Sequence, residues 1–157
     1  MTKELHIHRS ETRVLYGDTD AGGAVYNANY LRYFELGRGN LMRDWLISYR
    51  AIEKMGFSMP LIESWLRYKA SARYDDLIVI ETSVAEVSQH ICTFAYKIVR
   101  FEEGLEKPRL LCKGYTAHVA VGMDGKLADL PAELTRQLAA LINPVPPVRR
   151  FGAKKSA

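Results

Sequence analysis

The sequence predicts an α+β domain in which an antiparallel sheet wraps around one long central helix. Two observations carry this prediction. A helical spacing of apolar residues runs from about residue 28 to residue 55, whereas the chain beyond Pro60 changes to short runs rich in β-branched and aromatic residues. The joints between these runs are too short for crossover connections, so neighbouring strands are expected to be antiparallel hairpins.

The first predicted strand covers residues 4–16 and leads into a glycine-containing loop. The apolar stripe of the long helix that follows consists of Tyr30, Phe34, Leu41, Trp45, Tyr49 and Ile52. Gly37 and Gly39 interrupt this helix at a cost on the order of 1 kcal/mol each relative to alanine. That cost predicts that another element packs very close to the helix at these positions. Gly56 is placed to end the helix.

Four strand-length runs follow, at residues 61–69, 77–87, 91–101 and 109–122. Alternation assigns their core faces, which hold Ile78, Ile80 and Val84 in the second run and Cys92, Phe94, Tyr96 and Ile98 in the third. A turn is expected at residues 123–126. A short helix is expected over residues 132–142, with Pro131 in its first turn.

Length and charge indicate one domain with a short tail. The chain has 157 residues, of which 1–143 are assigned to a single domain and 144–157 to a Pro-rich basic tail. The net charge of +4 is carried by four tail residues, Arg149, Arg150, Lys154 and Lys155. The remainder is balanced, with 18 basic and 18 acidic residues. A general nucleic-acid partner is therefore not expected.

No apolar run approaches the roughly 20 residues of a membrane helix, and the polar start lacks a signal-peptide core. We therefore expect a cytoplasmic protein without membrane insertion. Cys92 and Cys112 lie in predicted strands without metal-ligand spacing, and they are expected to be reduced core residues. His6, His8, His90 and His118 are expected to be solvated or core histidines, and no metal site is predicted.

The loop before the long helix has a composition that folding alone does not explain. Asp18 and Asp20 stand one residue apart among three glycines, Gly17, Gly22 and Gly23. Asn27 or Asn29 is a suitable N-cap, so the loop can lead into a helix start with free amide N–H groups. A carboxylate beside such amides is equipped to attack a carbonyl whose oxygen the amides polarise. The alternative is a solvated turn in which either aspartate only caps backbone N–H groups.

Two other interpretations of this loop fail. A calcium-binding loop starting at Asp18 would need glutamate at its twelfth position, where Asn29 stands, and a third acid where Gly22 stands. A phosphate-binding loop would need the Gly-Lys-Ser/Thr sequence, which does not follow these glycines.

Residues 16–35, YGDTDAGGAVYNANYLRYFE, resemble the signature of the 4-hydroxybenzoyl-CoA thioesterase and YbgC-type branch of the hot-dog fold. The later segments 66–68 (LRY), 74–76 (YDD) and 114–118 (GYTAH) also resemble this family. The resemblance implies a hot-dog domain that assembles as a homodimer or homotetramer. It also implies hydrolysis of an acyl-CoA thioester to a free carboxylic acid and CoA, without a metal or organic cofactor.

The resemblance further implies which residues act. The catalytic aspartate falls on Asp20, as nucleophile or as general base, and the carbonyl-polarising amide lies at or next to Asn27. Many relatives carry histidine where Asn27 stands, and asparagine cannot act as a titrating acid. Asp18 is expected to cap the loop. Substrate binding is assigned to Gly22, Gly23, Tyr26, Arg67 and Lys69, and the candidates for the CoA phosphates are Arg67, Lys69, Arg73, Arg100 and Lys113.

Two rival functions stay open. A non-catalytic acyl-CoA-binding or interaction module could use the same fold. A hydratase or dehydratase acting on an acyl thioester usually needs a histidine and an acid in its pocket, and residues 16–56 contain no histidine.

Overall fold

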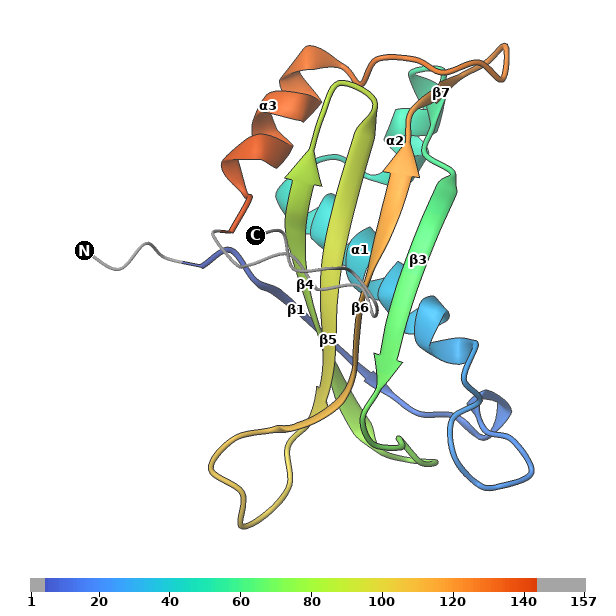
Figure 1. Ribbon diagram of the computed structural model, residues 1–157, viewed down its shortest axis with the longest axis vertical. Coiled ribbons are helices and arrows are strands. Elements are labelled where there is room, and N and C mark those ends of the chain that lie inside the picture. The colour runs from blue at the N-terminus through green and yellow to red at the C-terminus, as the bar shows by residue number, and fades with distance from the viewer. Residues whose placement is uncertain (1–4, 144–157) are drawn as a thin grey trace, which may run out of the picture.

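A five-stranded antiparallel sheet packs on one face against a long helix in the computed structural model, which describes residues 5–143. The elements follow in the order β1 (His8–Arg13), the 3₁₀ turn η1 (Tyr16–Asp18), α1 (Asn29–Trp45), α2 (Tyr49–Lys54), β2 (Phe57–Ser58), β3 (Leu61–Tyr68), β4 (Leu77–Val87), β5 (Ile91–Arg100), β6 (Arg109–Val119), β7 (Val121–Gly122) and α3 (Ala132–Ala140). The strand order is β1-β4-β5-β6-β3, and α1 crosses behind the sheet in Figure 1. The predicted α+β arrangement is confirmed.

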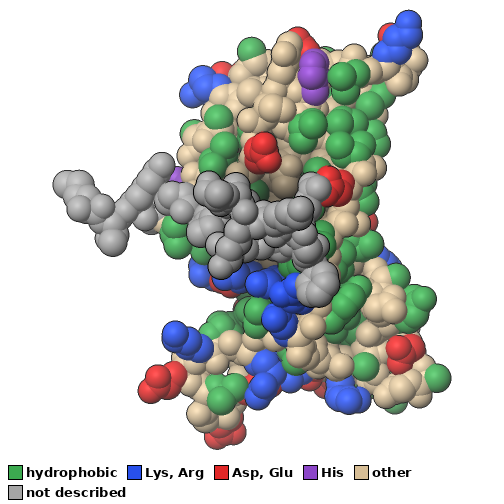
Figure 2. Space-filling model, viewed as in Figure 1, with side chains coloured by type: hydrophobic (Ala, Val, Ile, Leu, Met, Phe, Trp, Pro, Cys, Tyr) green, Lys and Arg blue, Asp and Glu red, His purple; other side chains and the backbone are tan. Residues whose placement is uncertain are grey.

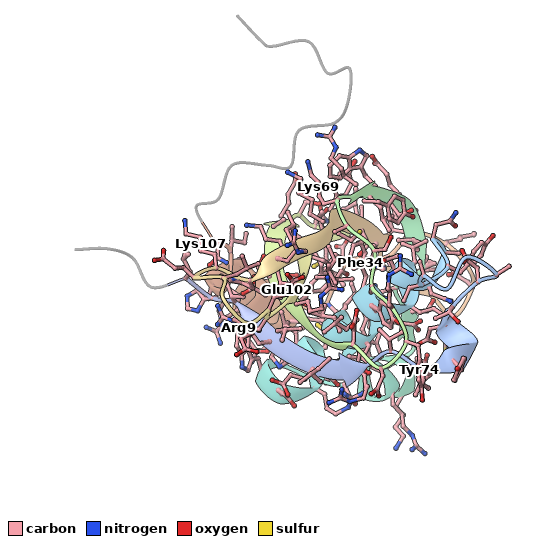
Figure 3. All side chains as sticks on the ribbon, turned by 90° about the horizontal axis from the view of Figure 1, so that it is seen from below. Arg9, Phe34, Lys69, Tyr74, Glu102 and Lys107 are labelled. Carbon is pink, nitrogen blue, oxygen red and sulfur yellow. The ribbon has the colours of Figure 1, made fainter. Side chains whose placement is uncertain are left out.

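The core lies between α1 and the sheet. Phe34 is fully buried, and its ring stacks on Tyr96 of β5 with centroids 4.2 Å apart and an interplanar angle of 5°. In Figure 3, Phe34 lies inside this layer. The predicted core faces of β4 and β5 are also confirmed, because all seven of their residues are at most 2% exposed.

The predicted helix over residues 28–55 is wrong as a single element. α1 ends at Trp45, because Leu46 adopts a non-helical backbone conformation with φ −134° and ψ −107°. Ser48 then starts α2, and its Oγ accepts a hydrogen bond from the Ala51 amide at 3.2 Å. The break also removes Trp45 from the core stripe; it is 41% exposed, with its ring edge-on to His8.

The strand and helix ends need smaller corrections. β1 is limited to His8–Arg13, and α3 stops at Ala140. The predicted strand over residues 109–122 is two strands, because β6 pairs with β3 and β5, whereas β7 pairs with β2. The turn at residues 123–126 is confirmed, with Gly125 at φ +76°. The predicted tail lies outside the described residues.

Both cysteines are free and fully buried, as predicted. Cys92 lies in β5 and Cys112 in β6. Burial raises the pKa of each thiol to about 12, so neither is a thiolate near neutral pH.

The close approach predicted at the helix glycines occurs at only one of them. A Cβ on Gly37 would lie 2.6 Å from Ile80 Cγ2 and would also overlap Thr82 Oγ1, so β4 presses directly on the helix backbone there. At Gly39 the nearest atom to such a Cβ is Arg43 Nη2, 3.9 Å away, so the prediction is wrong at that position. Gly39 instead faces a cavity on the outer side of α1.

We expect Gly37→Ala to lower the free energy of unfolding by about 1–3 kcal/mol, because the added methyl group overpacks the helix–sheet contact. Gly39→Ala is the matched control. It should raise the free energy of unfolding by about 0.5–1 kcal/mol, since it removes a helix glycine without a clash. Urea unfolding of both variants measures the difference, and equal gains at the two positions would contradict the close contact with β4.

Candidate functional site

The loop between β1 and α1 is a closed turn held by its own backbone. The Asp20 amide donates to Ala24 O at 2.9 Å, and the Gly23 amide donates back to Asp20 O at 3.0 Å. Gly23 has φ +77°, a left-handed conformation that favours glycine. The Val25 amide donates to Ala72 O at 2.9 Å, which ties the loop to the segment that follows β3.

Asp18 caps this loop, as predicted. Its Oδ2 accepts hydrogen bonds from the Leu15 amide and from the Tyr33 hydroxyl, both at 2.9 Å. Its main-chain oxygen accepts from Asn29 Nδ2 at 2.8 Å. Burial, together with the hydrogen bond to Asp18, raises the pKa of Tyr33, so this hydroxyl remains a donor. Asp18 therefore links the loop to the first turns of α1.

Asp20 has a different environment although it lies only two residues away. It is exposed, and its Oδ1 accepts a hydrogen bond from the Gly22 amide at 2.8 Å. Its Oδ2 accepts no hydrogen bond from the part of the chain that the structure describes. One oxygen is thus held in place while the other is available to a ligand or to water. Asp20 does not line the cavity on the outer side of α1.

The helix start differs from the prediction in its capping. Ala28 is the N-cap, with no side-chain cap, because Asn29 already donates to Asp18 O and Asn27 makes no capping bond. The expected side-chain N-cap at Asn27 or Asn29 is therefore wrong. The amides of Asn29, Tyr30 and Leu31 donate to carbonyls three residues earlier. Those of Asn27 and Ala28 have no acceptor within residues 5–143.

The end of β3 meets this helix start. The Tyr68 hydroxyl donates to Asn27 O at 3.0 Å, and its ring packs edge-on against Tyr30 at 5.4 Å. On the loop itself, Gly22, Gly23 and Tyr26 are exposed. Gly22 and Gly23 each donate a backbone hydrogen bond to Asp20, whereas the Tyr26 amide donates to Asp18 O.

The predicted phosphate-binding cations do not share one surface. Arg67 stacks over Trp65 on the face of the sheet opposite α1, where its register partner is Lys113 and the next is Lys97. Figure 2 shows Lys and Arg side chains gathered over the lower half of this face. Lys69 lies at the rim of the molecule in Figure 3.

Two of these cations have protein partners nearby. Arg100 forms ion pairs with Asp76 and Glu102, both at 2.7 Å, which commit its guanidinium to the fold. Arg73 Nη1 donates to Gly23 O at 3.5 Å, next to the loop. Arg73 is therefore the candidate that lies nearest to the loop by its contacts.

A cavity of about 920 Å³ runs along the outer side of α1. Its lining spans the helix from Asn29 to Arg43 and includes Asp18 and Tyr33 at one end and Tyr49 and Met59 at the other. Among residues 5–143, no group of three or more His, Cys, Asp and Glu side chains is arranged to share a metal ion. No helix in the same range is long and apolar enough to span a membrane.

The histidines are structural in their contacts. His8 is buried and bonds Asp44 at 2.8 Å, and His90 lies 3.1 Å from Asp129. His6 uses its backbone to pair with Asn143. His118 is 1% exposed and lies in the core. The expected core position is confirmed for His8 and His118, whereas His6 and His90 are half-buried.

His118 ends a line of hydrogen bonds that starts at Arg38 on α1. Burial, with a smaller contribution from the Arg38 charge, lowers the pKa of His118 to about 4, so the ring is neutral. Met59 O can only accept, so His118 Nδ1 donates to it at 3.2 Å, and Nε2 accepts from the Thr116 hydroxyl at 2.9 Å. Thr116 must then accept from Tyr96 at 2.6 Å, and Tyr96 accepts from Arg38 Nη1 at 3.3 Å. The donor and the acceptor of every hydrogen bond in this line are therefore determined.

Sequence reasoning missed the parts played by Tyr33, Tyr68 and Arg38. Tyr33 lies beside the apolar stripe rather than on it, and Tyr68 belongs to the LRY segment without a role being evident there. A hydroxyl at the edge of an apolar face is the one local signal available, because a buried Tyr hydroxyl needs a partner. Which partner it finds depends on segments distant in sequence.

We expect stability to fall as the pH drops from about 6.5 to about 4. The pKa of His118 is lower in the folded state than in the unfolded chain, so the unfolded chain binds the proton first and the folded state loses up to about 3 kcal/mol across this window. His118→Asn removes the titrating group. The carboxylates contribute equally to the pH dependence of both proteins, so the difference between the urea midpoints of the wild type and the variant reports on His118 alone. Equal pH slopes in the two proteins would contradict a neutral, buried His118.

Comparison with known proteins places the chain in a family. The family model described as the thioesterase-like superfamily matches residues 14–138. YbgC of Escherichia coli O157:H7, an acyl-CoA thioester hydrolase, is 32% identical over 99 residues, which cover 63% of this chain and 74% of YbgC.

Solved structures agree. The AQ1494 protein of Aquifex aeolicus is 32% identical, with a TM-score of 0.74 over 83% of this chain and 98% of that chain. Slr0204 of Synechocystis, a 1,4-dihydroxy-2-naphthoyl-CoA thioesterase, shares the fold with a TM-score of 0.76 at 24% identity, over 88% of this chain and 99% of that chain. The hot-dog fold expected from the sequence is confirmed, and the chain belongs to the thioesterase-like superfamily.

Proposed function

We propose that this chain is an acyl-CoA thioesterase, which converts an acyl-CoA and water to a free carboxylic acid and CoA. The observation that carries the proposal is one closed loop that holds the Asp20 carboxylate and leads into two amides, of Asn27 and Ala28, without acceptors in the described chain. The similarity to YbgC, an acyl-CoA thioester hydrolase, supports the same reaction class.

The amides at the helix start are suited to the thioester oxygen. As the carbonyl is attacked, its oxygen gains negative charge, and N–H groups at a helix N-terminus stabilise that charge. The loss of one such donor typically lowers the rate by about 10²–10³. We assign this task to the backbone at Asn27 and Ala28. The Tyr68 hydroxyl, bonded to Asn27 O, holds the peptide in position.

Asp20 supplies the attack by one of two routes. As a general base it takes a proton from water, the water oxygen bonds to the carbonyl carbon, the C–S bond breaks, and the thiolate of CoA takes the proton. As a nucleophile, its free Oδ2 bonds to the carbonyl carbon and expels the thiolate, and water then opens the mixed anhydride. Both routes need one carboxylate oxygen that the fold does not use, and Oδ2 meets this requirement.

The Asn27 side chain cannot supply a proton to the leaving group. A thiol has a pKa near 8.5, so the departing thiolate is stable enough not to need a dedicated acid. We therefore assign Asn27 a role through its backbone amide. A hydratase reaction would need a pocket histidine, and the buried His118 has both ring nitrogens bonded inside the core.

Binding of the CoA part is assigned to the exposed surface around the loop. Gly22 and Gly23 leave room for close approach of the thioester, and Tyr26 offers an exposed ring beside them. Arg67 lies near the end of β3 on the outer face of the sheet, and Lys69 is the first residue after this strand. The cross-sheet row that Arg67 forms with Lys113 and Lys97 offers cations for the phosphates.

We also propose that the chain self-associates as a homodimer or homotetramer. β3 is an edge strand of the sheet, and Leu61 and Ile62 on it are 49% and 54% exposed. An exposed apolar edge of this kind favours pairing with another strand. A cytoplasmic location stays a prediction from the sequence.

We expect Asp20→Asn to abolish thiol release from acyl-CoAs, with a loss of at least about 10³-fold in kcat, because the amide can neither attack nor accept a proton. Asp124→Asn is the matched control, since Asp124 is also exposed and its Oδ1 also accepts from the amide two residues later, at 3.0 Å. A panel of aromatic and aliphatic acyl-CoAs serves as substrate. Equal rates in wild type and Asp20→Asn would rule out the assigned role, and binding without any turnover would favour the acyl-CoA-binding module.

The self-association proposal is tested at the β3 edge. We expect the wild type to sediment as a dimer or larger species and Ile62→Lys to shift toward the monomer, because a charge on the edge opposes strand pairing. Leu105→Lys is the control, since Leu105 is similarly exposed at 47% but lies in the loop after β5. A wild type that sediments as a monomer would refute the proposal.

A further inference from the structure

The main-chain oxygen of Asp18 anchors the segment that leads into α1. It accepts two hydrogen bonds, one from the Tyr26 amide at 2.9 Å and one from Asn29 Nδ2 at 2.8 Å. These two residues stand directly before and directly after Asn27 and Ala28, whose amides have no acceptor in the described chain. Both lone pairs of one carbonyl oxygen are therefore used to hold the two sides of this pair of amides.

Residues 26–29 form a closed turn over this oxygen. The Asn29 amide donates to Tyr26 O at 2.9 Å, so the turn is also bonded to itself. N–H groups at the start of a helix point away from it, toward its N-terminal side. Asn27 and Ala28 are exposed, so a ligand can approach their amides from that side. The direction of these amides depends on the two bonds that tie the turn to Asp18 O.

The Asn29 side chain supplies the bond from the helix. It is half-buried and belongs to the first residue of α1. A main-chain oxygen can only accept, so the Asn29 atom that faces Asp18 O is the amide nitrogen. Tyr33, one turn further along α1, bonds the Asp18 carboxylate and not its main-chain oxygen. Asn29 is therefore the side chain of α1 that fixes this oxygen.

The same bond links the helix to the stretch of chain that carries Asp20. Asp20 follows Asp18 by two residues, and Thr19 between them donates twice to Tyr16 O, through its amide at 3.1 Å and its hydroxyl at 2.7 Å. The chain from Asp18 to Asp20 is therefore short and restrained. A displacement of reacting groups by about 1 Å can lower a rate by about 10²-fold, so the Asn29 bond bears on the geometry of the reaction.

We propose that Asn29 is a positioning residue of the thioesterase site, which holds the Asn27 and Ala28 amides in the direction that receives the thioester oxygen. The inference rests on the proposed function and adds a residue that acts through the backbone of its neighbours. Loss of its side-chain bond leaves the carboxylate and both amides in the chain but frees the turn to move relative to the loop. The chemical step should slow with little change in CoA binding, because Arg67 and Lys69 lie outside the turn.

The test compares Asn29→Ala with Asn40→Ala in the full chain. Asn40 is the matched control, because it is also a half-buried asparagine of α1 and its Nδ2 also donates one hydrogen bond, to Ser10 Oγ at 3.2 Å. Each substitution removes this bond and adds a good helix former, so similar urea midpoints are expected. In the thiol-release assay, Asn29→Ala should lower kcat at least about 10-fold and change KM less than about 3-fold. Asn40→Ala should change kcat less than about 2-fold.

A double-mutant cycle with Tyr68→Phe separates positioning from a general loss of structure. Tyr68→Phe removes the other side-chain bond to this turn, the one to Asn27 O. Since both bonds orient the same two amides, the variant with Asn29→Ala and Tyr68→Phe should lose less in kcat than the product of the two single losses. With Asn40→Ala in place of Asn29→Ala, the losses should multiply. Multiplied losses for Asn29→Ala and Tyr68→Phe, or a wild-type kcat in Asn29→Ala, would overturn the proposal.

Residual dipolar couplings of the Asn27 and Ala28 N–H bonds measure their direction without relying on turnover. The couplings should agree between wild type and Asn40→Ala and differ in Asn29→Ala, because a bond that moves or turns no longer keeps one direction. Unchanged couplings in Asn29→Ala would refute the positioning role, whatever happens to kcat. A wild type that releases no thiol but shows this difference in couplings would refute the proposed function and leave Asn29 as the anchor of the turn.

Discussion

The contact between α1 and β4 is the constraint on which the candidate site depends. Gly37 brings the helix backbone against Ile80 and Thr82, and Phe34 stacks flat on Tyr96 one turn earlier. Together these contacts fix the rotation and height of the helix over the sheet. The helix start is then placed beside the end of β3, where Tyr68 bonds Asn27 O. Packing in the middle of the domain therefore positions the amides proposed to polarise a carbonyl.

The two aspartates of the loop differ in how many of their oxygens the fold uses in hydrogen bonds. The Asp18 carboxylate accepts hydrogen bonds from Leu15 and Tyr33, and its main-chain oxygen accepts one from Asn29, so Asp18 joins the loop to the helix. Asp20 accepts a hydrogen bond from Gly22 through Oδ1, and its Oδ2 accepts none within the described residues. A carboxylate that is fully used by the fold is a poor base or nucleophile, whereas one held by a single oxygen is oriented and still reactive.

Polar groups in the helix–sheet layer are joined in one line of hydrogen bonds. His118, Thr116 and Tyr96 satisfy one another in this line with defined donor directions, which is how buried polar groups normally persist in a core. Arg38 stands at the outer end of the line, where its Nη1 donates to Tyr96 and its guanidinium lies over the Tyr49 ring. The line therefore ties the middle of α1 to β5 and β6.

The sequence by itself determined the class of fold, the faces of β4 and β5 and the position of the loop, because alternation, helical spacing and glycine placement are local properties of the chain. The YGDTDAGG segment also indicated both aspartates. The tertiary structure alone decided that the helix breaks at Leu46, where the apolar period continues but the backbone turns. It alone gave Gly37 and Gly39 different surroundings, and Asp18 and Asp20 different partners. It alone brought Arg38 to the outer end of the hydrogen-bonded line through Tyr96. These facts depend on which distant segments meet, and the contacts between them are set by the packing of the whole sheet against α1.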